Sequence, residues 1–127
     1  MFGTAISCMD GRIQEPIRRY ITERFGLEHV DVITQPGIDG VLAGETTGGK
    51  SRIELIKCML SISVNAHGSS TIVISGHYDC AGHPVSDEQH IHDIKKAVSR
   101  VKSWDGMSAI QVIGVWVNKD WKVEVVA

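Results

Sequence analysis

The stretch TIVISGHYDCAG, residues 71–82, joins an apolar run to a histidine and a cysteine. TIVIS (71–75) is almost continuously apolar, which is typical of a strand covered on both faces of a parallel sheet. His77 and Cys80 follow at the point where this strand is expected to end. Because the chain has only three cysteines, a cysteine placed three residues after a histidine indicates a chemical role.

Alternating strand and helix patterns surround this central strand. We expect four further strands, at 2–7, 29–34, 109–118 and 121–127. Helices are expected from Gln14 to Phe25 and over about 87–102. A glycine-rich loop at 35–50 leads into another helix, which begins with Ser51 and Glu54 as a capping box. This order predicts a three-layer α/β/α fold with a mostly parallel sheet, a strand order of about 2-1-3-4-5 and an antiparallel last strand. The length of 127 residues fits one domain, residues 1–127.

The strand order predicts where a ligand site lies. In open parallel sheets, ligands bind at the carboxyl ends of the strands, where the strand order reverses. The expected order places this reversal between the first and third strands. Cys8 follows the first strand, and His77 and Cys80 follow the third. We therefore expect these three side chains to converge.

Two thiolates and one imidazole form a ligand set that suits zinc. Three protein ligands leave the fourth position of a tetrahedral ion to water or substrate, which is typical of a catalytic zinc site. The sequence therefore predicts Zn²⁺ bound by Cys8, His77 and Cys80. The alternative is that the cysteines are inert packing, which is our interpretation of Cys58 within the second helix.

Asp10 and Arg12 lie two and four residues after Cys8, in the same loop. A bidentate pair between them would orient the carboxylate toward a zinc-bound water, which makes both residues catalytic candidates. The alternative is an exposed ion pair with little effect on stability.

Composition narrows the possible partners and compartments. The net charge of −2 gives no reason to expect nucleic acid or an anionic membrane as partner, and no apolar run approaches the roughly 18 residues that a membrane-spanning helix needs. The first residues lack the pattern of a secretory signal. Three cysteines cannot all pair with one another, so thiols in a reducing cytoplasm are expected instead of a disulfide framework.

Two motifs together resemble those of the β-class carbonic anhydrases. They are Cys-Met-Asp-Gly-Arg at residues 8–12 and His-Tyr-Asp-Cys at residues 77–80, and the likeness extends over residues 5–94. The pair of motifs is much more specific than either motif alone.

The resemblance implies a zinc enzyme that converts carbon dioxide reversibly to bicarbonate. Cys8, His77 and Cys80 would bind the zinc, and Asp10, paired with Arg12 in a dyad, would accept a hydrogen bond from the zinc-bound hydroxide that attacks carbon dioxide. In some family members the aspartate itself ligates zinc, and the sequence leaves open whether Asp10 or water takes that position. The family also implies a homodimer or higher homo-oligomer, and the apolar terminal strand near Trp104, Trp116 and Trp121 is expected to bury surface against a second copy.

The sequence departs from the family pattern in two places. The chain begins at the first strand without an N-terminal helical arm, and Thr-Gln-Pro-Gly at 34–37 stands where many relatives have Arg-Asn-Ala-Gly. The substrate-pocket residues of the family are therefore not carried over. Two alternative functions stay open, a related zinc hydrolase of carbon disulfide or carbonyl sulfide and a non-catalytic zinc protein of the same fold.

A competing motif lies at GETTGGKS, residues 44–51, which matches the pattern of a phosphate-binding loop. Such a loop should follow a strand directly, whereas the strand at 29–34 ends about ten residues earlier, so nucleotide binding is the less favoured alternative. Backbone amides at Gly49, Lys50 and Ser51 could still bind an anion such as bicarbonate or phosphate.

Histidines near the second motif have several interpretations. His83 is either a proton shuttle at the mouth of the site or a solvated loop residue. His90 and His92 lie two residues apart on a helix, so they do not share a face and form a poor metal-binding pair.

Overall fold

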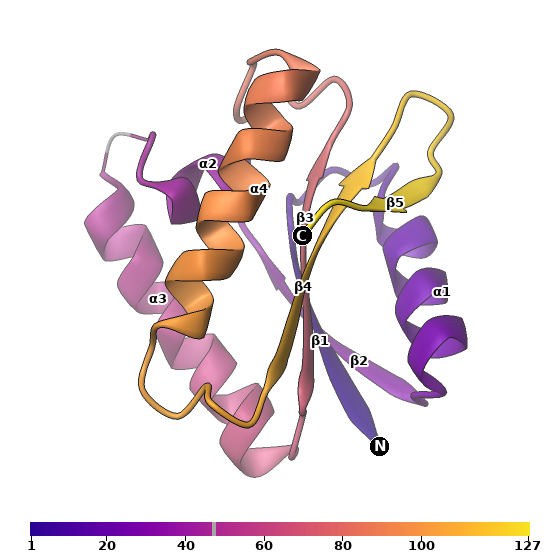
Figure 1. Cartoon of the computed structure of the whole chain (residues 1–127), viewed down its shortest axis with the longest axis vertical. Helices are drawn as coiled ribbons and strands as arrows, with labels where there is room; N and C mark the ends of the chain where they lie inside the picture. The colour runs from indigo at the N-terminus through magenta and orange to yellow at the C-terminus, as the bar shows by residue number, and fades with distance from the viewer. Residues whose placement is uncertain (47) are drawn as a thin grey trace.

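The computed structural model describes residues 1–46 and 48–127, and Figure 1 shows the whole chain. The elements in chain order are β1 (Phe2–Ser7), α1 (Gln14–Phe25), β2 (His29–Thr34), α2 (Ile38–Ala43), α3 (Gly49–Ser61), the π-helix η1 (Ile62–Ala66), β3 (Thr71–His77), α4 (Asp87–Lys102), β4 (Gln111–Val117) and β5 (Val123–Val125).

The strands form one sheet in the order β2-β1-β3-β4-β5. All neighbouring pairs are parallel except β4 and β5, which are antiparallel. The chain leaves β1 toward β2 on one side and returns to β3 on the other, so the strand order reverses between β1 and β3. The predicted fold class, strand order and antiparallel last strand are confirmed.

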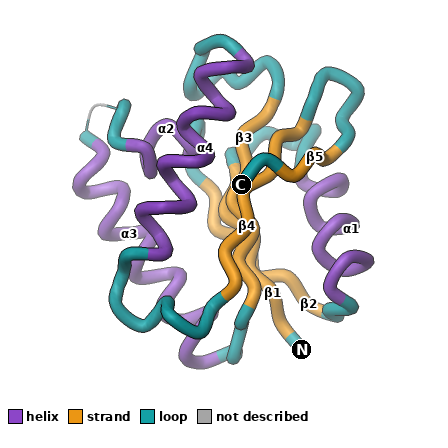
Figure 2. Tube along the Cα trace, in the orientation of Figure 1, coloured by secondary structure: helices purple, strands orange, loops and turns teal. Residues whose placement is uncertain are grey.

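Helices cover both faces of the sheet, so the fold has three layers. Helix α1 lies on one face, and α2, α3 and α4 lie on the other (Figures 1 and 2). Because successive strand residues point to opposite faces, β3 contributes Ile72 and Ile74 to the core beneath α3 and α4, and Val73 to the core beneath α1. Every residue of β3 is buried, as the apolar run predicted.

The segment expected to be one glycine-rich loop contains a helix. Helix α2 comprises only six residues, IDGVLA, and all of them are buried. Glycine and aspartate have poor helix propensity, so the sequence pattern favours a loop here. Burial of the apolar residues against α3, α4 and the sheet overrides that local preference.

The capping box expected at Ser51 and Glu54 is wrong. Helix α3 begins at Gly49, and its N-cap is Gly48, which has left-handed backbone angles (φ 74°, ψ 12°) and no side chain to cap the helix. Ser51 therefore lies inside the first turn and is exposed. Its hydroxyl has no capping role because the cap position is already occupied by the glycine.

Two further expectations change at the ends of elements. Strand β3 extends through His77, which pairs with Val117 of β4, so the histidine closes the strand and does not follow it. Strand β5 is shorter than expected, and Trp121 before it has a left-handed backbone (φ 58°). Within the described residues, no helix has the length and apolar character needed to cross a membrane.

Candidate metal centre

The reversal of strand order brings three predicted ligands together. Cys8 comes directly after β1, His77 is the last residue of β3, and Cys80 lies three residues further on. Their ligand atoms all lie within 4.8 Å of one another, and the two Sγ atoms are 3.9 Å apart. All three side chains are buried. The structure thus places the predicted zinc ligands in one cluster.

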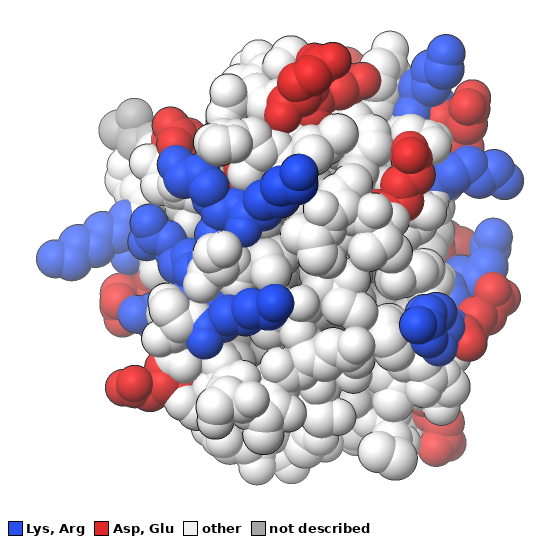
Figure 3. All heavy atoms as spheres, in the orientation of Figure 1, with Lys and Arg blue, Asp and Glu red and all other residues white. Residues whose placement is uncertain are grey.

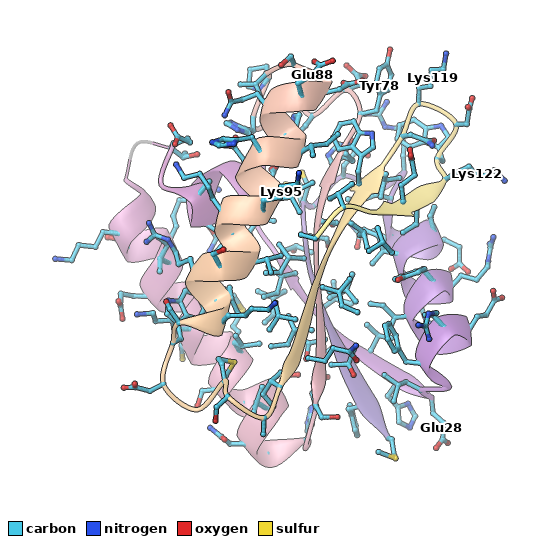
Figure 4. The ribbon with its side chains drawn as sticks, viewed as in Figure 1. Glu28, Tyr78, Glu88, Lys95, Lys119 and Lys122 are labelled. Carbon is cyan, nitrogen blue, oxygen red and sulfur yellow. The ribbon has the colours of Figure 1, made fainter. Side chains whose placement is uncertain are left out.

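A tight turn after β3 makes this convergence possible. The Tyr78 backbone N–H donates to the carbonyl oxygen of Val117 (2.8 Å), which continues the pairing with β4 for one more residue. Asp79 then takes a left-handed conformation (φ 58°), one that aspartate tolerates better than most residues. This reverses the chain, so Cys80 returns to His77, while the Tyr78 side chain lies at the surface (Figure 4).

The ring of His77 presents one nitrogen to the cluster. Its Nδ1 lies 2.8 Å from the Tyr78 carbonyl oxygen, which can only accept, so Nδ1 must donate the hydrogen bond. Nε2 is then the lone-pair nitrogen of the neutral ring, and it is buried without a hydrogen-bond partner. A ring whose outer nitrogen is committed to a carbonyl is the usual arrangement for a histidine that ligates a metal.

The two thiols are coupled to each other. The pKa of Cys8 is lowered to about 3, chiefly because the Cys80 thiol donates a hydrogen bond to it, with smaller contributions from the neighbouring His77 ring and the Gly37 backbone N–H (3.4 Å). The pKa of Cys80 is raised by the same hydrogen bond and by burial. Burial is the largest single effect and lowers the pKa of His77, but the Cys8 sulfur, the Tyr78 carbonyl oxygen and the Asp10 carboxylate together raise it by more, so the net shift is upward. Cys8 therefore ionises first.

This donor set fits zinc. Two closely spaced sulfur atoms, one of them readily ionised, and one unpartnered imidazole nitrogen match the soft S₂N ligand set of zinc sites. A divalent cation would also remove the proton that the two sulfur atoms share, because thiols bind metal as thiolates.

Asp10 and Arg12 form the predicted bidentate pair. The Arg12 Nε donates to Asp10 Oδ1 (3.0 Å) and Nη2 donates to Oδ2 (2.7 Å), while the Arg12 backbone N–H also donates to Oδ1 (2.9 Å). These contacts lower the pKa of Asp10 to about 2. The carboxylate is therefore ionised at neutral pH and held in one orientation by a planar group.

Arg12 is itself held by two other residues. Its Nη1 donates to Asp79 Oδ2 (3.2 Å) and its Nη2 to the Asp79 carbonyl oxygen (3.1 Å), and the guanidinium lies 4.7 Å from the centre of the Trp121 ring. Asp79 thereby links the Asp10 loop to the turn that carries Cys80.

Gln14 is a residue of this site that the sequence reasoning missed. Its Nε2 donates to the carbonyl oxygens of Cys8 and Asp10, both at 2.8 Å. The side chain thus fixes the loop between β1 and α1 from the first residue of the helix. No sequence signal marks this role, because a glutamine at a helix start is common and its partners are backbone atoms.

The segment after β2, residues 35–37, holds the metal centre in place through contacts with α3 and with the loop after β3. Arg52 donates to the Gln35 side chain (2.8 Å) and to the Pro36 carbonyl oxygen (2.7 Å), which ties the segment after β2 to α3. Gly37 then packs directly on Gly82 with a left-handed backbone (φ 60°), and an added Cβ would lie 2.6 Å from the Gly82 carbonyl group. The loops that contribute Cys8 and Cys80 are therefore locked together through this glycine.

The predicted anion-binding residues lie away from the metal centre. Gly49 and Lys50 line a cavity of about 310 Å³ beside α3 and α4, which shares no residue with the three ligands. Lysine and arginine side chains gather over this part of the surface (Figure 3). The segment follows helix α2 and not a strand, so it lacks the strand–loop–helix context of a nucleotide phosphate loop, and Thr47 of the motif lies outside the described residues.

Three other interpretations from the sequence need correction. Cys58 is exposed and is not packed in the core. His83 is buried and hydrogen-bonded to Asp93, so it is not a solvated loop residue. Trp116 is buried in the core of the chain, so it is not available to a second copy.

Comparison with known proteins identifies the family of the chain. A family model described as "Putative carbonic anhydrase" matches residues 1–127. No protein of curated function matches the chain.

Solved structures share the fold. A carbonic anhydrase from Glaciozyma antarctica has a TM-score of 0.62 and 18% identity, over 98% of this chain and 81% of that chain. The β-carbonic anhydrase CcaA has a TM-score of 0.64 and 10% identity, over 98% and 79%. One of two tetrameric β-carbonic anhydrases from the filamentous ascomycete Sordaria macrospora has a TM-score of 0.64 and 12% identity, also over 98% and 79%. At these identities the likeness establishes the three-layer fold.

Proposed function

The chain belongs to the β-class carbonic anhydrase family, and on this premise we propose that it catalyses the reversible hydration of carbon dioxide to bicarbonate. The observation that carries the proposal is the cluster of Cys8, His77 and Cys80 next to an ionised Asp10. This cluster supports a metal site with a hydrogen-bond acceptor beside it.

In this proposal Cys8, His77 and Cys80 would hold Zn²⁺, through two Sγ atoms and Nε2. Zinc supplies Lewis acidity, which in favourable sites lowers the pKa of a water molecule to about 7 and so provides a nucleophile at neutral pH. Two thiolates donate more charge than imidazoles, so the acidity here is expected to be weaker than in a site of three histidines. The hydrogen bond from Nδ1 to the Tyr78 carbonyl oxygen fixes the ring orientation.

Asp10 would accept a hydrogen bond from the water or hydroxide that attacks carbon dioxide. Arg12 keeps this carboxylate ionised and engages both Asp10 oxygens, which disfavours Asp10 as a metal ligand. Asp79 and Trp121 restrict the movement of Arg12, which stabilises this orientation. The role of Asp10 is to orient, and the role of Arg12 is to position Asp10.

The proposal extends to assembly and location. We propose one zinc domain over residues 1–127 that forms a homo-oligomer in the cytoplasm. The tetrameric β-carbonic anhydrases of Sordaria macrospora support the assembly, as do apolar side chains exposed at Val32, Leu55 and Ile62. Sedimentation that detects only a 13.9 kDa species would contradict it.

A hydration assay on zinc-loaded protein tests the activity. We expect Asp10→Asn to reduce the rate by about 10²–10⁴-fold while zinc content is unchanged, since the variant loses a positioned acceptor but no metal ligand. Asp105→Asn is the matched control, because Asp105 is exposed in the loop after α4. Equal losses in the two variants would remove Asp10 from the mechanism.

The same experiment separates the alternatives. Bound zinc without hydration at any pH would overturn the proposed substrate. Carbon disulfide and carbonyl sulfide are then assayed with the same variants, and turnover of either that depends on Asp10 would assign a related hydrolase. No turnover of any of the three substrates would assign a non-catalytic zinc protein.

A further inference from the structure

A second cluster of potential ligands lies on the opposite face of the sheet from the metal centre. Asp39 of α2, His83 of the loop after Cys80, and His90 of α4 place their ligand atoms within 4.8 Å of one another. All three are buried, with exposed fractions of 1%, 8% and 1%. None of them takes part in the carbon dioxide chemistry proposed above.

The orientation of His83 is fixed by a carboxylate. Its Nε2 lies 2.6 Å from Asp93 Oδ2, and Gln89 donates to the other Asp93 oxygen at 2.8 Å. If Nε2 carries the proton, Nδ1 is the nitrogen with a free lone pair. A histidine whose outer nitrogen is hydrogen-bonded to a carboxylate is the arrangement that metal-ligating histidines most often show.

His90 provides an independent observation. Its Nδ1 lies 2.5 Å from Asp39 Oδ2, whereas its Nε2 is buried and has no hydrogen-bond partner. The ring is confined between His83, whose centroid is 5.1 Å away, and Trp116 at 5.4 Å. The nitrogen of His90 that faces Asp39 is therefore Nδ1, and this atom can join Asp39 in binding a cation.

The charge of the cluster needs compensation. Asp39 and Asp93 are both buried, and within the described part of the chain no lysine or arginine nitrogen lies within 4 Å of either carboxylate. Buried carboxylates require positive charge nearby. A single divalent cation bound by neutral histidines would supply two positive charges, which matches the two carboxylates.

His83 and Asp39 pack against glycines, where any larger residue would clash with them. A Cβ added at Gly40 would lie 2.7–2.8 Å from three atoms of the His83 ring, so the ring packs against the bare backbone of α2. A Cβ at Gly76 would lie 2.6 Å from Asp39 Oδ2. The cluster is therefore closely fitted to the carboxyl end of β3, where Gly76 faces α4 and the next residue, His77, faces the metal centre.

We propose that Asp39, His83 and His90 bind a second divalent cation of the zinc class, with Asp93 orienting His83. Two imidazole nitrogens and one carboxylate oxygen are ligands that Zn²⁺ accepts, and the absence of sulfur distinguishes this site chemically from the first. The cation takes the place of the proton between His90 and Asp39. It ties α2, the 81–86 loop and α4 together, so its role is structural.

Metal stoichiometry tests the proposal. Metal-free protein in reducing buffer is titrated with Zn²⁺ by calorimetry, and bound zinc is counted after desalting. We expect about two equivalents per chain for the wild type and about one for Cys8→Ser/Cys80→Ser, which removes only the first site. Adding His90→Gln to that double variant should abolish binding. Adding His92→Gln should not, because His92 is the exposed histidine two residues further along α4.

Several outcomes would overturn the second site. These are one equivalent in the wild type, no binding by the cysteine double variant, or equal binding by the His90→Gln and His92→Gln versions. If His90→Gln does not fold, Asp39→Asn removes the anionic ligand with little change of shape, and the wild-type stoichiometry decides without any variant. Co²⁺ absorption from thiolates reports the first site alone, so the failure of either site can be recognised separately.

Discussion

Replacement of Gly37 by alanine tests whether the two ligand-bearing loops are locked by direct backbone contact. Gly37 has a left-handed backbone (φ 60°), and an added Cβ would lie 2.6 Å from the Gly82 carbonyl carbon and oxygen. The left-handed conformation costs a non-glycine residue about 1–2 kcal/mol. The clash adds about 1–3 kcal/mol, because it is with backbone that cannot rotate away. The expected loss of unfolding free energy is therefore about 2–5 kcal/mol.

Two other glycines separate these contributions. Gly26 has nearly the same backbone (φ 64°) but nothing within 4 Å of an added Cβ, so Gly26→Ala should lose only the conformational part. Gly11 has neither a left-handed backbone nor a neighbour within 4 Å, so Gly11→Ala should be close to neutral.

Urea denaturation of metal-free protein measures the series. With a typical slope of about 1–3 kcal/mol per molar urea, the Gly37→Ala midpoint should fall below that of Gly26→Ala by about 1 M. Zinc affinity should also fall in Gly37→Ala, because Cys8 and Cys80 are held together by the same contact. Equal midpoints for Gly37→Ala and Gly26→Ala would refute the packing argument.

Three further predictions concern the site. Arg12→Ala should raise the pKa of Asp10 from about 2 toward its ordinary 3.8, because Arg12 is the main cause of the lowered value. The stabilisation that this pair gives the folded state is present above the unfolded-state pKa and is lost as the pH falls toward 2. An NMR titration of the Asp10 carboxyl carbon that gives the same pKa in the variant and the wild type would contradict this prediction. Gln14→Ala should weaken zinc binding by about 10–100-fold, since it removes the hydrogen bonds to the Cys8 and Asp10 carbonyl oxygens. Competition with a chelating dye measures the zinc affinity, and an unchanged affinity would contradict the prediction. Removal of metal with a chelator should lower the melting temperature by on the order of 10 °C, and addition of zinc should restore it. The reason is that a ligand at 1,000-fold excess over its Kd stabilises the native state by about 4 kcal/mol. Identical calorimetric transitions with and without chelator would exclude a bound metal.

The sequence predicted the features that depend on long-range alternation. Runs such as TIVIS (71–75) and the helical pattern after Gln14 indicated buried strands and amphipathic helices, and the sheet order inferred from them is confirmed. The family resemblance came from the two motifs instead, and the family model that matches residues 1–127 confirms it. The two motifs also named the residues that the fold brings together, because the ends of adjacent parallel strands meet at one edge of the sheet.

Other features arise only from tertiary contact. Helix α2 forms because burial outweighs the poor propensity of IDGVLA, which no local pattern shows. Gln14 acts through backbone carbonyl groups, so its neighbours in sequence carry no signal. His90 was considered only with His92, its neighbour on the helix, whereas its contacts are Asp39 and His83 from two other segments.

Titration of metal-free protein with Co²⁺ tests whether Cys8 and Cys80 bind one metal ion, because cobalt replaces zinc and its bonds to thiolates absorb strongly. We expect this absorption in the wild type and in Cys58→Ser, a weaker signal in Cys8→Ser and in Cys80→Ser, and no signal when both are replaced. Absorption that survives the double replacement, or that disappears in Cys58→Ser, would contradict this expectation.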